Sequence, residues 1–332
     1  MITIKDIAAK AGVAKSTVSN VLSGKKYVSP EIAEKVMKIC KEIDYQPNFY
    51  AATLSAKTKI NIIGLFLEES KEGKYRKFYS LLIEGILTAA SKYNNSLLIY
   101  SGLDNVETTK KLKVGKSPID GAIVLSPTIN DGRVDKISKS LIPLILIGHS
   151  GDVAHEFDCV DTDNVGLTYT ISKKMMEQNY TNLCLINSKE ELVISKERDA
   201  GLVKACKEVN NESYHIYHCK STHGVEPYEY AKKGIENGCN AFICASGNVA
   251  NGVYKACKEA DLVIGKDVVV FSLGYSFDNT LKFEPELSYA SQDYYRFGEI
   301  ATKHLIDKIN GETKSVKEII NSEFHIHESF KF

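Results

Sequence analysis

Five short polar or basic side chains lie close together near the start of the sequence, at Lys15, Ser16, Ser19, Asn20 and Ser23. Serine and asparagine are mediocre helix formers, yet the apolar residues of the same stretch recur at helical spacing. A helix of this composition packs its apolar side inward and turns hydroxyls, an amide and a long cation outward. Such side chains can approach the phosphates and base edges of a DNA major groove without steric conflict. The alternative is an ordinary solvated helix face.

The elements that would position these side chains are short helices. An apolar stripe over residues 4–11 follows Thr3 and carries Asp6 in its first turn, a pattern that predicts a capped helix start. Gly12 interrupts the stripe, and a second stripe runs over residues 14–22 as far as Gly24. Two short helices joined by a glycine-containing turn predict a helix-turn-helix.

A third helix is expected after Ser29, because Pro30 and Glu31 suit the first turn of a helix. Its apolar residues would close a three-helix core, and they are Ile32, Val36, Ile39, Cys40 and Ile43. Residues 44–47, with the sequence DYQP, end this helix.

The order of motifs across residues 2–66 resembles the lactose-repressor and galactose-repressor family of bacterial transcription regulators. The motifs that carry the resemblance are TIKDIA (3–8), AGV (11–13), TVS (17–19), VSP (28–30), YQPN (45–48) and AATL (51–54). The resemblance implies a DNA-binding helix-turn-helix over residues 1–46, and a hinge helix and linker over residues 47–59 that enter the minor groove as a dimer. It places the base-reading side chains at Lys15, Ser16 and Asn20.

Leu54 takes the family position of a leucine that wedges into the centre of the operator. Unstacking a base step costs a few kcal/mol, which the contacts made by the bent DNA offset. An ordinary linker hydrophobe is the alternative for this residue. The full set of expected DNA contacts is Thr3, Lys5, Lys15, Ser16, Thr17, Ser19, Asn20, Tyr27, Asn48, Ala51 and Leu54.

Charge is divided unevenly along the chain. Residues 1–60 hold ten lysines and no arginine against five acidic residues, whereas the whole chain has 42 basic and 42 acidic residues. A basic head on an acidic body is what phosphate neutralisation needs, and it predicts salt-dependent DNA binding. Lysine favours positioning contacts over the bidentate recognition of guanine.

The rest of the chain alternates apolar runs with amphipathic segments. The apolar runs lie at residues 62–67, 97–100, 122–125, 144–148, 183–186, 215–217, 241–244 and 268–271. Apolar runs separated by helical patterns predict parallel strands covered on both faces. We therefore expect a small all-α helix-turn-helix head and an α/β body of two doubly wound parallel-sheet lobes, with a ligand cleft outside the carboxyl ends of the strands.

The resemblance continues more loosely through this effector-binding and dimerisation domain, residues 60–332. It implies two lobes of the periplasmic-binding-protein type, joined by three crossings of the chain. Lobe 1 is expected over residues 60–158 and 292–317, and lobe 2 over residues 159–291 and 318–332.

The resemblance also implies an effector site in the cleft. Arg198 occupies the family's effector-binding arginine position, and Gln292 matches a glutamine at the pocket edge. Gly148, Ser246 and Ser272 stand where the family often carries acidic or amide side chains that hold sugar hydroxyls. The expected pocket is therefore less acidic than a typical sugar site.

Three kinds of effector remain open. An anion such as a sugar phosphate would bind Arg198 with the hydroxyls of Ser246 and Ser272. A larger, less polar ligand would stack on aromatic residues, of which the candidates are Phe78, Tyr79, Tyr275 and Phe277. A cleft without a ligand would leave control to a protein partner or to the protein's own abundance. The effector residues expected are Phe78, Arg198, Ser246, Ser272 and Gln292, with a structural salt bridge as the alternative for Arg198.

Other classes of protein find little support in the sequence. The eight cysteines are scattered and predict reduced core residues. No apolar run is long enough for a membrane span, and the N-terminus lacks a signal-peptide pattern, so a cytoplasmic protein is expected. Partial phosphate-loop and zinc motifs at residues 115–117 and 155–159 lack required residues, and His325 and His327 are interpreted as surface histidines. We expect no metal, no cofactor and no enzyme activity.

The leading hypothesis is a repressor of a carbohydrate-utilisation operon. It would bind pseudo-palindromic operator DNA as a homodimer or tetramer and respond allosterically to a sugar or sugar phosphate. The alternatives are a regulator with a non-sugar effector or a protein coregulator, and a small-molecule binding protein with a vestigial head. Corepression by the effector is also left open.

Overall fold

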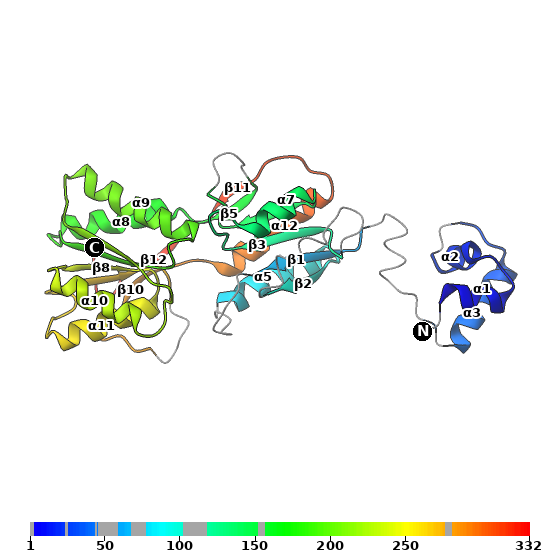
Figure 1. Ribbon diagram of the computed structural model, residues 1–332, viewed down its shortest axis with the longest axis horizontal. Coiled ribbons are helices and arrows are strands. Elements are labelled where there is room, and N and C mark those ends of the chain that lie inside the picture. Colours follow the sequence, from blue (N-terminus) through cyan, green and yellow to red (C-terminus); the bar gives the residue numbers. More distant parts are fainter. Residues whose placement is uncertain are drawn as a thin grey trace. The chain divides into compact units, whose positions relative to one another are not determined.

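The computed structural model describes residues 3–23, 26–43, 45, 59–67, 78–101, 118–151, 157–275 and 281–332. The chain divides into two compact units, Met1–Ile60 and Asn61–Phe332. Each unit is described here by itself (Figure 1). No helix in the described ranges is both long and apolar enough to cross a membrane.

The described residues of the first unit form a bundle of three helices. They are α1 (Ile4–Ala11), α2 (Lys15–Ser23) and α3 (Pro30–Glu42). The backbone N–H of Thr3 donates to the Asp6 carboxylate over 2.7 Å at the start of α1, and Gly12 ends the helix in the left-handed conformation at φ 68°. The core of the bundle consists of Ile7, Ala8, Ala11, Val18, Val36 and Cys40. These helices confirm the three-helix prediction, while residues 47–58 of the expected hinge lie outside the described part of the chain.

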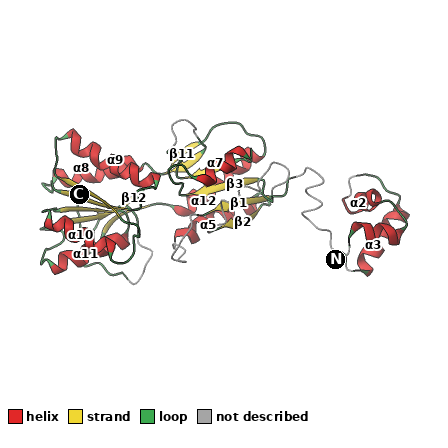
Figure 2. Ribbon diagram, viewed as in Figure 1, coloured by secondary structure: helices red, strands yellow, loops and turns green. Residues whose placement is uncertain are grey.

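The second unit contains two six-stranded sheets, coloured yellow in Figure 2. The first sheet has the order β11-β5-β4-β3-β1-β2, and its neighbouring strands pair in parallel. Its strands are β1 (Ile62–Phe66), β2 (Ser96–Tyr100), β3 (Gly121–Leu125), β4 (Leu144–Ile147), β5 (Cys159–Asp161) and β11 (Lys317–Ile319). The described helices of this lobe are α5 (Phe78–Lys92), α7 (Gly132–Lys139) and α12 (Tyr294–Ile309).

The second sheet has the order β12-β10-β9-β8-β6-β7. Its strands pair in parallel, except that β12 runs antiparallel to β10. They are β6 (Leu183–Asn187), β7 (Tyr214–His218), β8 (Ala241–Cys244), β9 (Val269–Ser272), β10 (Ser288–Ser291) and β12 (Glu323–His325). The helices of this lobe are α8 (Asn164–Glu177), α9 (Val193–Glu208), α10 (Glu226–Glu236) and α11 (Gly247–Glu259).

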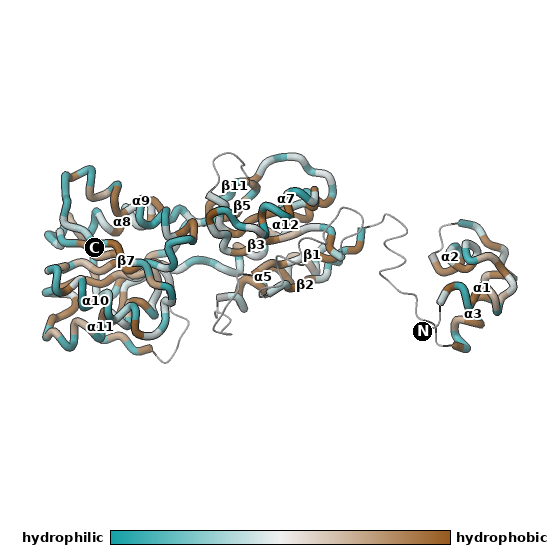
Figure 3. Tube along the Cα trace, viewed as in Figure 1, coloured by the Kyte–Doolittle hydropathy of each residue, from teal (hydrophilic) through white to brown (hydrophobic). Residues whose placement is uncertain are grey.

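The structure confirms the doubly wound α/β prediction. A strand forms at each of the eight apolar runs, and every residue of β3, β4, β6 and β8 is buried. Hydrophobic residues recur along the strands of both sheets (Figure 3). The eight cysteines are all buried, which confirms the prediction of core residues, and none forms a disulfide.

The expected lobe boundaries at residues 158/159 and 317/318 are wrong by a few residues. Both β5 and β11 belong to the first sheet, where β11 pairs with β5 and β5 pairs with β4. The chain therefore leaves lobe 1 after Asp161 and again after Ile319. Each of these strands has only three residues, which is too short for an apolar period to mark it. The chain also passes from β10 in lobe 2 to α12 in lobe 1. It therefore crosses between the lobes three times.

Candidate functional site

The outer face of α2 presents the polar side chains that the sequence predicted. Lys15, Ser16 and Ser19 are exposed, Asn20 is half-buried, and Val18 on the opposite side of the helix is fully buried in the core of the unit. The packing of Val18 therefore fixes which side of α2 faces solvent. That side carries two hydroxyls and an ammonium group, which suit contacts with phosphates and base edges.

The other expected DNA contacts divide into two groups. Thr3 and Lys5 are exposed at the start of α1, Thr17 is half-buried on α2, and Tyr27 is 90% exposed between α2 and α3. A tyrosine this exposed is an available contact in the same unit as the polar face of α2. The remaining three expected contacts, Asn48, Ala51 and Leu54, lie outside the described residues.

A cavity of about 550 Å³ lies between the two lobes of the second unit. Lobe 1 contributes residues that follow its strands, among them Ser126, His149 and Asp161, and lobe 2 contributes Arg198, Ser246 and Tyr275. This is the place where parallel α/β sheets bind ligands, outside the carboxyl ends of the strands. Because both lobes line the cavity, a ligand in it would contact both.

Arg198 is a buried cation whose hydrogen-bonding groups are largely unused. It is 5% exposed, its Nη1 donates weakly to the carbonyl oxygen of Ala245 at 3.4 Å, and its Nε has no partner. Burial lowers the pKa of the Arg198 guanidinium to about 10. Within the described part of the chain Arg198 forms no ion pair with a carboxylate, so the structure gives no support to a structural salt bridge. Its position in the cavity wall agrees with the expected effector role.

Two more of the expected effector residues line the cavity, Ser246 and Gln292. Ser246 immediately precedes α11, and its buried hydroxyl has no hydrogen-bond partner. Gln292 is already engaged, because its Nε2 donates to the carbonyl oxygen of Leu273 at 2.9 Å and its Oε1 accepts the Tyr294 hydroxyl at 3.1 Å. Gln292 is therefore part of a fixed wall, whereas Ser246 has a free hydroxyl.

The expectation that Ser272 supplies a hydroxyl to the ligand is contradicted by the structure. Ser272 ends the buried strand β9, is fully buried, and donates its hydroxyl to the carbonyl oxygen of Gly274 at 2.6 Å. This hydroxyl stabilises the turn after the strand, and Ser272 is absent from the cavity lining.

The expected aromatic residues have different outcomes. Tyr79 belongs to the hydrophobic core of lobe 1. Tyr275 lines the cavity and packs on Tyr289, with ring centroids 4.8 Å apart. Phe78 begins α5, but its side chain lies outside the described part of the structure, as does all of Phe277.

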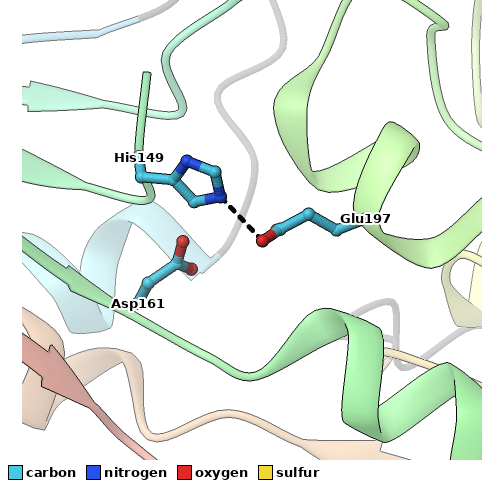
Figure 4. A group of neighbouring side chains, drawn as sticks. All are labelled: His149, Asp161 and Glu197. Carbon is cyan, nitrogen blue, oxygen red and sulfur yellow. Dashed lines mark hydrogen bonds and ion pairs between the residues drawn. The ribbon is translucent and has the colours of Figure 1, made fainter. Parts of the chain in front are cut away.

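A group of three titratable residues in the cavity wall escaped the sequence reasoning. His149, Asp161 and Glu197 bring an imidazole and two carboxylates together, with ligand-type atoms all within 4.8 Å of one another (Figure 4). His149 Nε2 lies 2.7 Å from Glu197 Oε1. The three residues come from separate segments of the chain, so no local sequence spacing predicted that they lie together. The available signals were that His149 follows the strand whose usual acid is replaced by Gly148, and that Glu197 directly precedes Arg198.

Burial and neighbouring charge shift the protonation of this group. Burial, with a smaller contribution from the Glu197 carboxylate, raises the pKa of Asp161 to about 7. The hydrogen bond to Glu197 raises the pKa of His149.

Two family models match separate parts of the chain. Residues 3–48 match the model of bacterial regulatory proteins of the lacI family, and residues 173–329 match the periplasmic binding protein-like domain. The first unit thus matches the helix-turn-helix domain of lacI-family regulatory proteins, and most of the second unit matches a periplasmic-binding-protein-like domain.

Curated relatives match nearly the whole chain. The HTH-type transcriptional regulator RegA of Clostridium saccharobutylicum is 26% identical over 93% of this chain and 92% of its own length. Catabolite control protein A of Staphylococcus aureus is 26% identical over 94% of this chain and 93% of its own length. MalR of Streptococcus pneumoniae, another HTH-type transcriptional regulator, is 26% identical over 98% of each chain.

Solved structures confirm the fold. A complex of the transcriptional regulator CelR with cellobiose superimposes with a TM-score of 0.72 at 21% identity, covering 99% of this chain and 100% of that chain. A Lac repressor dimer bound to operator and the anti-inducer ONPF gives a TM-score of 0.75 at 18% identity, covering 99% of this chain and 98% of that chain. Both share the arrangement of a helix-turn-helix and two α/β lobes.

Proposed function

We propose that this regulator is a homodimeric repressor of carbohydrate-utilisation genes. It binds operator DNA through the outer face of α2 and is controlled by a small molecule in the inter-lobe cavity. The observation that carries the proposal is the solvent-facing side of α2, where Lys15, Ser16 and Ser19 are exposed above the buried Val18. Relatives named for catabolite control and a structural neighbour complexed with cellobiose support a carbohydrate role.

The chemistry of the cavity favours an anionic, oxygen-rich effector such as a sugar phosphate. Arg198 offers an unpartnered Nε, and the free Ser246 hydroxyl lies at the N-terminus of α11. Helix N-termini attract anions because their backbone N–H groups and dipole point at the ligand. A phosphate bound here would use hydrogen-bond donors that are buried without protein partners.

Control of DNA binding by this effector follows from the position of the cavity. A ligand that contacts both lobes favours the lobe spacing that suits it, and it can shift a population only by its differential affinity for the two states. If the effector weakens operator binding, the operator must weaken effector binding by the same factor. Titrating the effector at several operator concentrations measures this coupling and its sign.

The repressor proposal is tested with DNA from beside the protein's own coding region. Fluorescence anisotropy at moderate salt should show binding at least about 1000-fold tighter to an operator-containing duplex than to a random duplex. Equal affinity for both duplexes would overturn the proposal and favour a small-molecule binding protein with a vestigial head.

The effector is sought separately by thermal shift with sugars and their phosphates. A ligand that binds only the native state raises the melting temperature with its concentration. We expect a sugar phosphate to stabilise the protein where the parent sugar does not. Stabilisation by the unphosphorylated sugar alone would contradict the anionic assignment.

A further inference from the structure

We propose that His149, Asp161 and Glu197 form a site for a divalent transition-metal ion that joins the two lobes across the cavity. His149 follows β4 and Asp161 ends β5, both in lobe 1, whereas Glu197 lies on α9 in lobe 2 (Figure 4). One nitrogen and two oxygen ligands from these residues lie within 4.8 Å of one another. This inference does not depend on DNA binding or on the identity of the effector.

Neighbouring donors already orient the two carboxylates. The backbone N–H of Thr162 donates to Asp161 Oδ1 at 2.7 Å. Asn164 Nδ2 donates to Glu197 Oε2 at 2.9 Å, and the same amide donates to the carbonyl oxygen of Thr162 at 3.1 Å. Each carboxylate is thus held through one oxygen, and the other oxygen of Glu197 lies 2.7 Å from His149 Nε2. Outer-shell hydrogen bonds of this kind are typical of metal-ligating carboxylates.

The two carboxylates of the group would be neutralised by a divalent cation when both are ionised. Asp161 is only 9% exposed, and in the described ranges it forms no ion pair with lysine or arginine. A second carboxylate, Glu197, lies beside it. In the described ranges the ion-pair partner of Glu197 is the imidazole of His149. Buried carboxylates are expensive unless they are paired or coordinate a metal. A divalent ion would neutralise both.

The donor set selects the kind of ion. One imidazole and two carboxylates suit Zn²⁺, which binds three protein ligands where a fourth position stays open. Mg²⁺ demands octahedral oxygen ligands and is disfavoured by the imidazole. Ligand atoms on a tetrahedral Zn²⁺ lie about 3.3 Å apart. The pair His149 Nε2 and Glu197 Oε1, now 2.7 Å apart, would therefore have to separate, and atoms near the 4.8 Å limit of the group would have to approach. The open position would face the cavity, whose wall also contains Arg198.

Binding requires a change in the hydrogen bonds of His149. At present Nε2 lies 2.7 Å from Glu197 Oε1, and Nδ1 accepts the backbone N–H of Gly151 at 3.1 Å. A metal on Nε2 displaces the proton shared with Glu197, the ring proton moves to Nδ1, and the Gly151 N–H loses its acceptor. The metal therefore competes with two hydrogen bonds, and we expect moderate rather than very tight affinity.

The test is calorimetric titration of the full-length, chelator-treated protein with ZnCl₂ in the absence of DNA and sugars. We expect one Zn²⁺ per chain, a rise in melting temperature with Zn²⁺, and little effect of MgCl₂ at the same concentration. Binding of no Zn²⁺, or stabilisation by Mg²⁺ equal to that by Zn²⁺, would overturn the proposal.

Variants locate the ion. His149→Gln, Asp161→Asn and Glu197→Gln should each weaken Zn²⁺ binding by about 100-fold or more, since even outer-shell partners are worth 10- to 100-fold. Glu197→Gln also tests the contribution of lobe 2. Far-UV circular dichroism and the metal-free melting temperature show that each variant is folded.

A second group provides the matched control. Glu286, His327 and Glu328 also place three ligand-type atoms within 4.8 Å of one another, but both of their acids are exposed. The substitution His327→Gln should leave Zn²⁺ affinity unchanged within about 2-fold. If His327→Gln removes binding while the three cavity variants retain it, the ion lies at the exposed group and the proposal is wrong.

Discussion

At the scale of single residues, Arg198 combines burial with unused donors. A guanidinium that is 5% exposed and forms no ion pair in the described part of the chain is costly to keep there. Its Nε lacks a partner, and its side chain lines the cavity. This arrangement supports the proposal that Arg198 binds the effector, at some cost to the stability of the protein.

Replacing Arg198 by methionine tests this conclusion. The variant should lose the shift in operator affinity caused by the effector, while its operator affinity without effector stays within about 3-fold of the native value. Its stability should be unchanged or increased, because a buried charge is replaced by an apolar chain of similar length. Arg296→Gln on the exposed side of α12 is the matched control and should respond normally. An unchanged response in Arg198→Met would refute the ligand role.

Leu54 is the residue on which the minor-groove proposal depends. If its side chain unstacks a base step, Leu54→Ala should weaken operator binding by about 10-fold or more, and random-duplex binding by less than about 2-fold. Competition titrations with the two duplexes at one salt concentration measure both effects. Equal losses for the two duplexes would remove the wedge assignment.

The site residues show what a sequence reveals at this scale. Arg198, Ser246 and Gln292 were found because each stands at a position defined by surrounding motifs, and all three line the cavity. Ser272 was wrongly included, because a motif cannot show that a hydroxyl is already used by its own turn. Its partner, the carbonyl oxygen of Gly274, becomes apparent only in three dimensions.

At the scale of elements, the helices α5 and α12 approach so closely that glycine is required on both. A Cβ on Gly298 would lie 2.2 Å from the carbonyl oxygen of Leu82, and a Cβ on Gly85 would lie 2.0 Å from that of Tyr295. Both obstacles are backbone atoms, which cannot move aside as a flexible side chain does. The two helices must therefore separate if either glycine gains a side chain.

The substitution Gly298→Ala should destabilise the second unit by about 1–3 kcal/mol or more, because overpacking outweighs the gain in helix propensity. Gly132→Ala at the start of α7 is the control, since nothing lies within 4 Å of its added Cβ. Its stability should change by less than about 1 kcal/mol. Urea unfolding measures the free energy of unfolding of both variants. Equal values would show that α5 and α12 can separate at no cost in stability.

Strands differ in how well the sequence revealed them. The apolar runs that formed β3 and β4 are buried on both faces, so composition alone marked them. The three-residue strands β5 and β11 were missed as members of the first sheet, because their pairing depends on segments more than 150 residues apart. The group of His149, Asp161 and Glu197 includes the last residue of β5. Because β5 was not predicted as a strand of the first sheet, the sequence did not predict this group.

At the scale of the whole molecule, the two units differ in net charge. Ten of the 42 basic residues and only five of the 42 acidic ones fall within residues 1–60. The sequence alone shows this imbalance. It does not show which partners the two units bind.

The charge imbalance predicts how DNA binding depends on salt. If a dimer makes 6–10 phosphate contacts, raising the salt from 50 to 200 mM should lower affinity by about 10³-fold or more. Anisotropy titrations at four salt concentrations give the slope, and the same slope is expected for random DNA if lysines mainly position the protein. Affinity that varies less than about 3-fold over this range would show that phosphate contacts are not the main source of binding.

The three crossings between the lobes also govern how the protein is made. Lobe 1 needs α12 and β11, which are synthesised after all of lobe 2 except β12, so lobe 1 stays incomplete until most of lobe 2 has been made. At 5–20 residues per second the ribosome takes roughly 15 to 55 s to proceed from the end of the helical head to β11. In the later part of that interval, once β6 has been made, the nascent chain carries a finished helical head and two incomplete sheets with exposed edges. Chaperone protection is therefore needed most in the last third of synthesis.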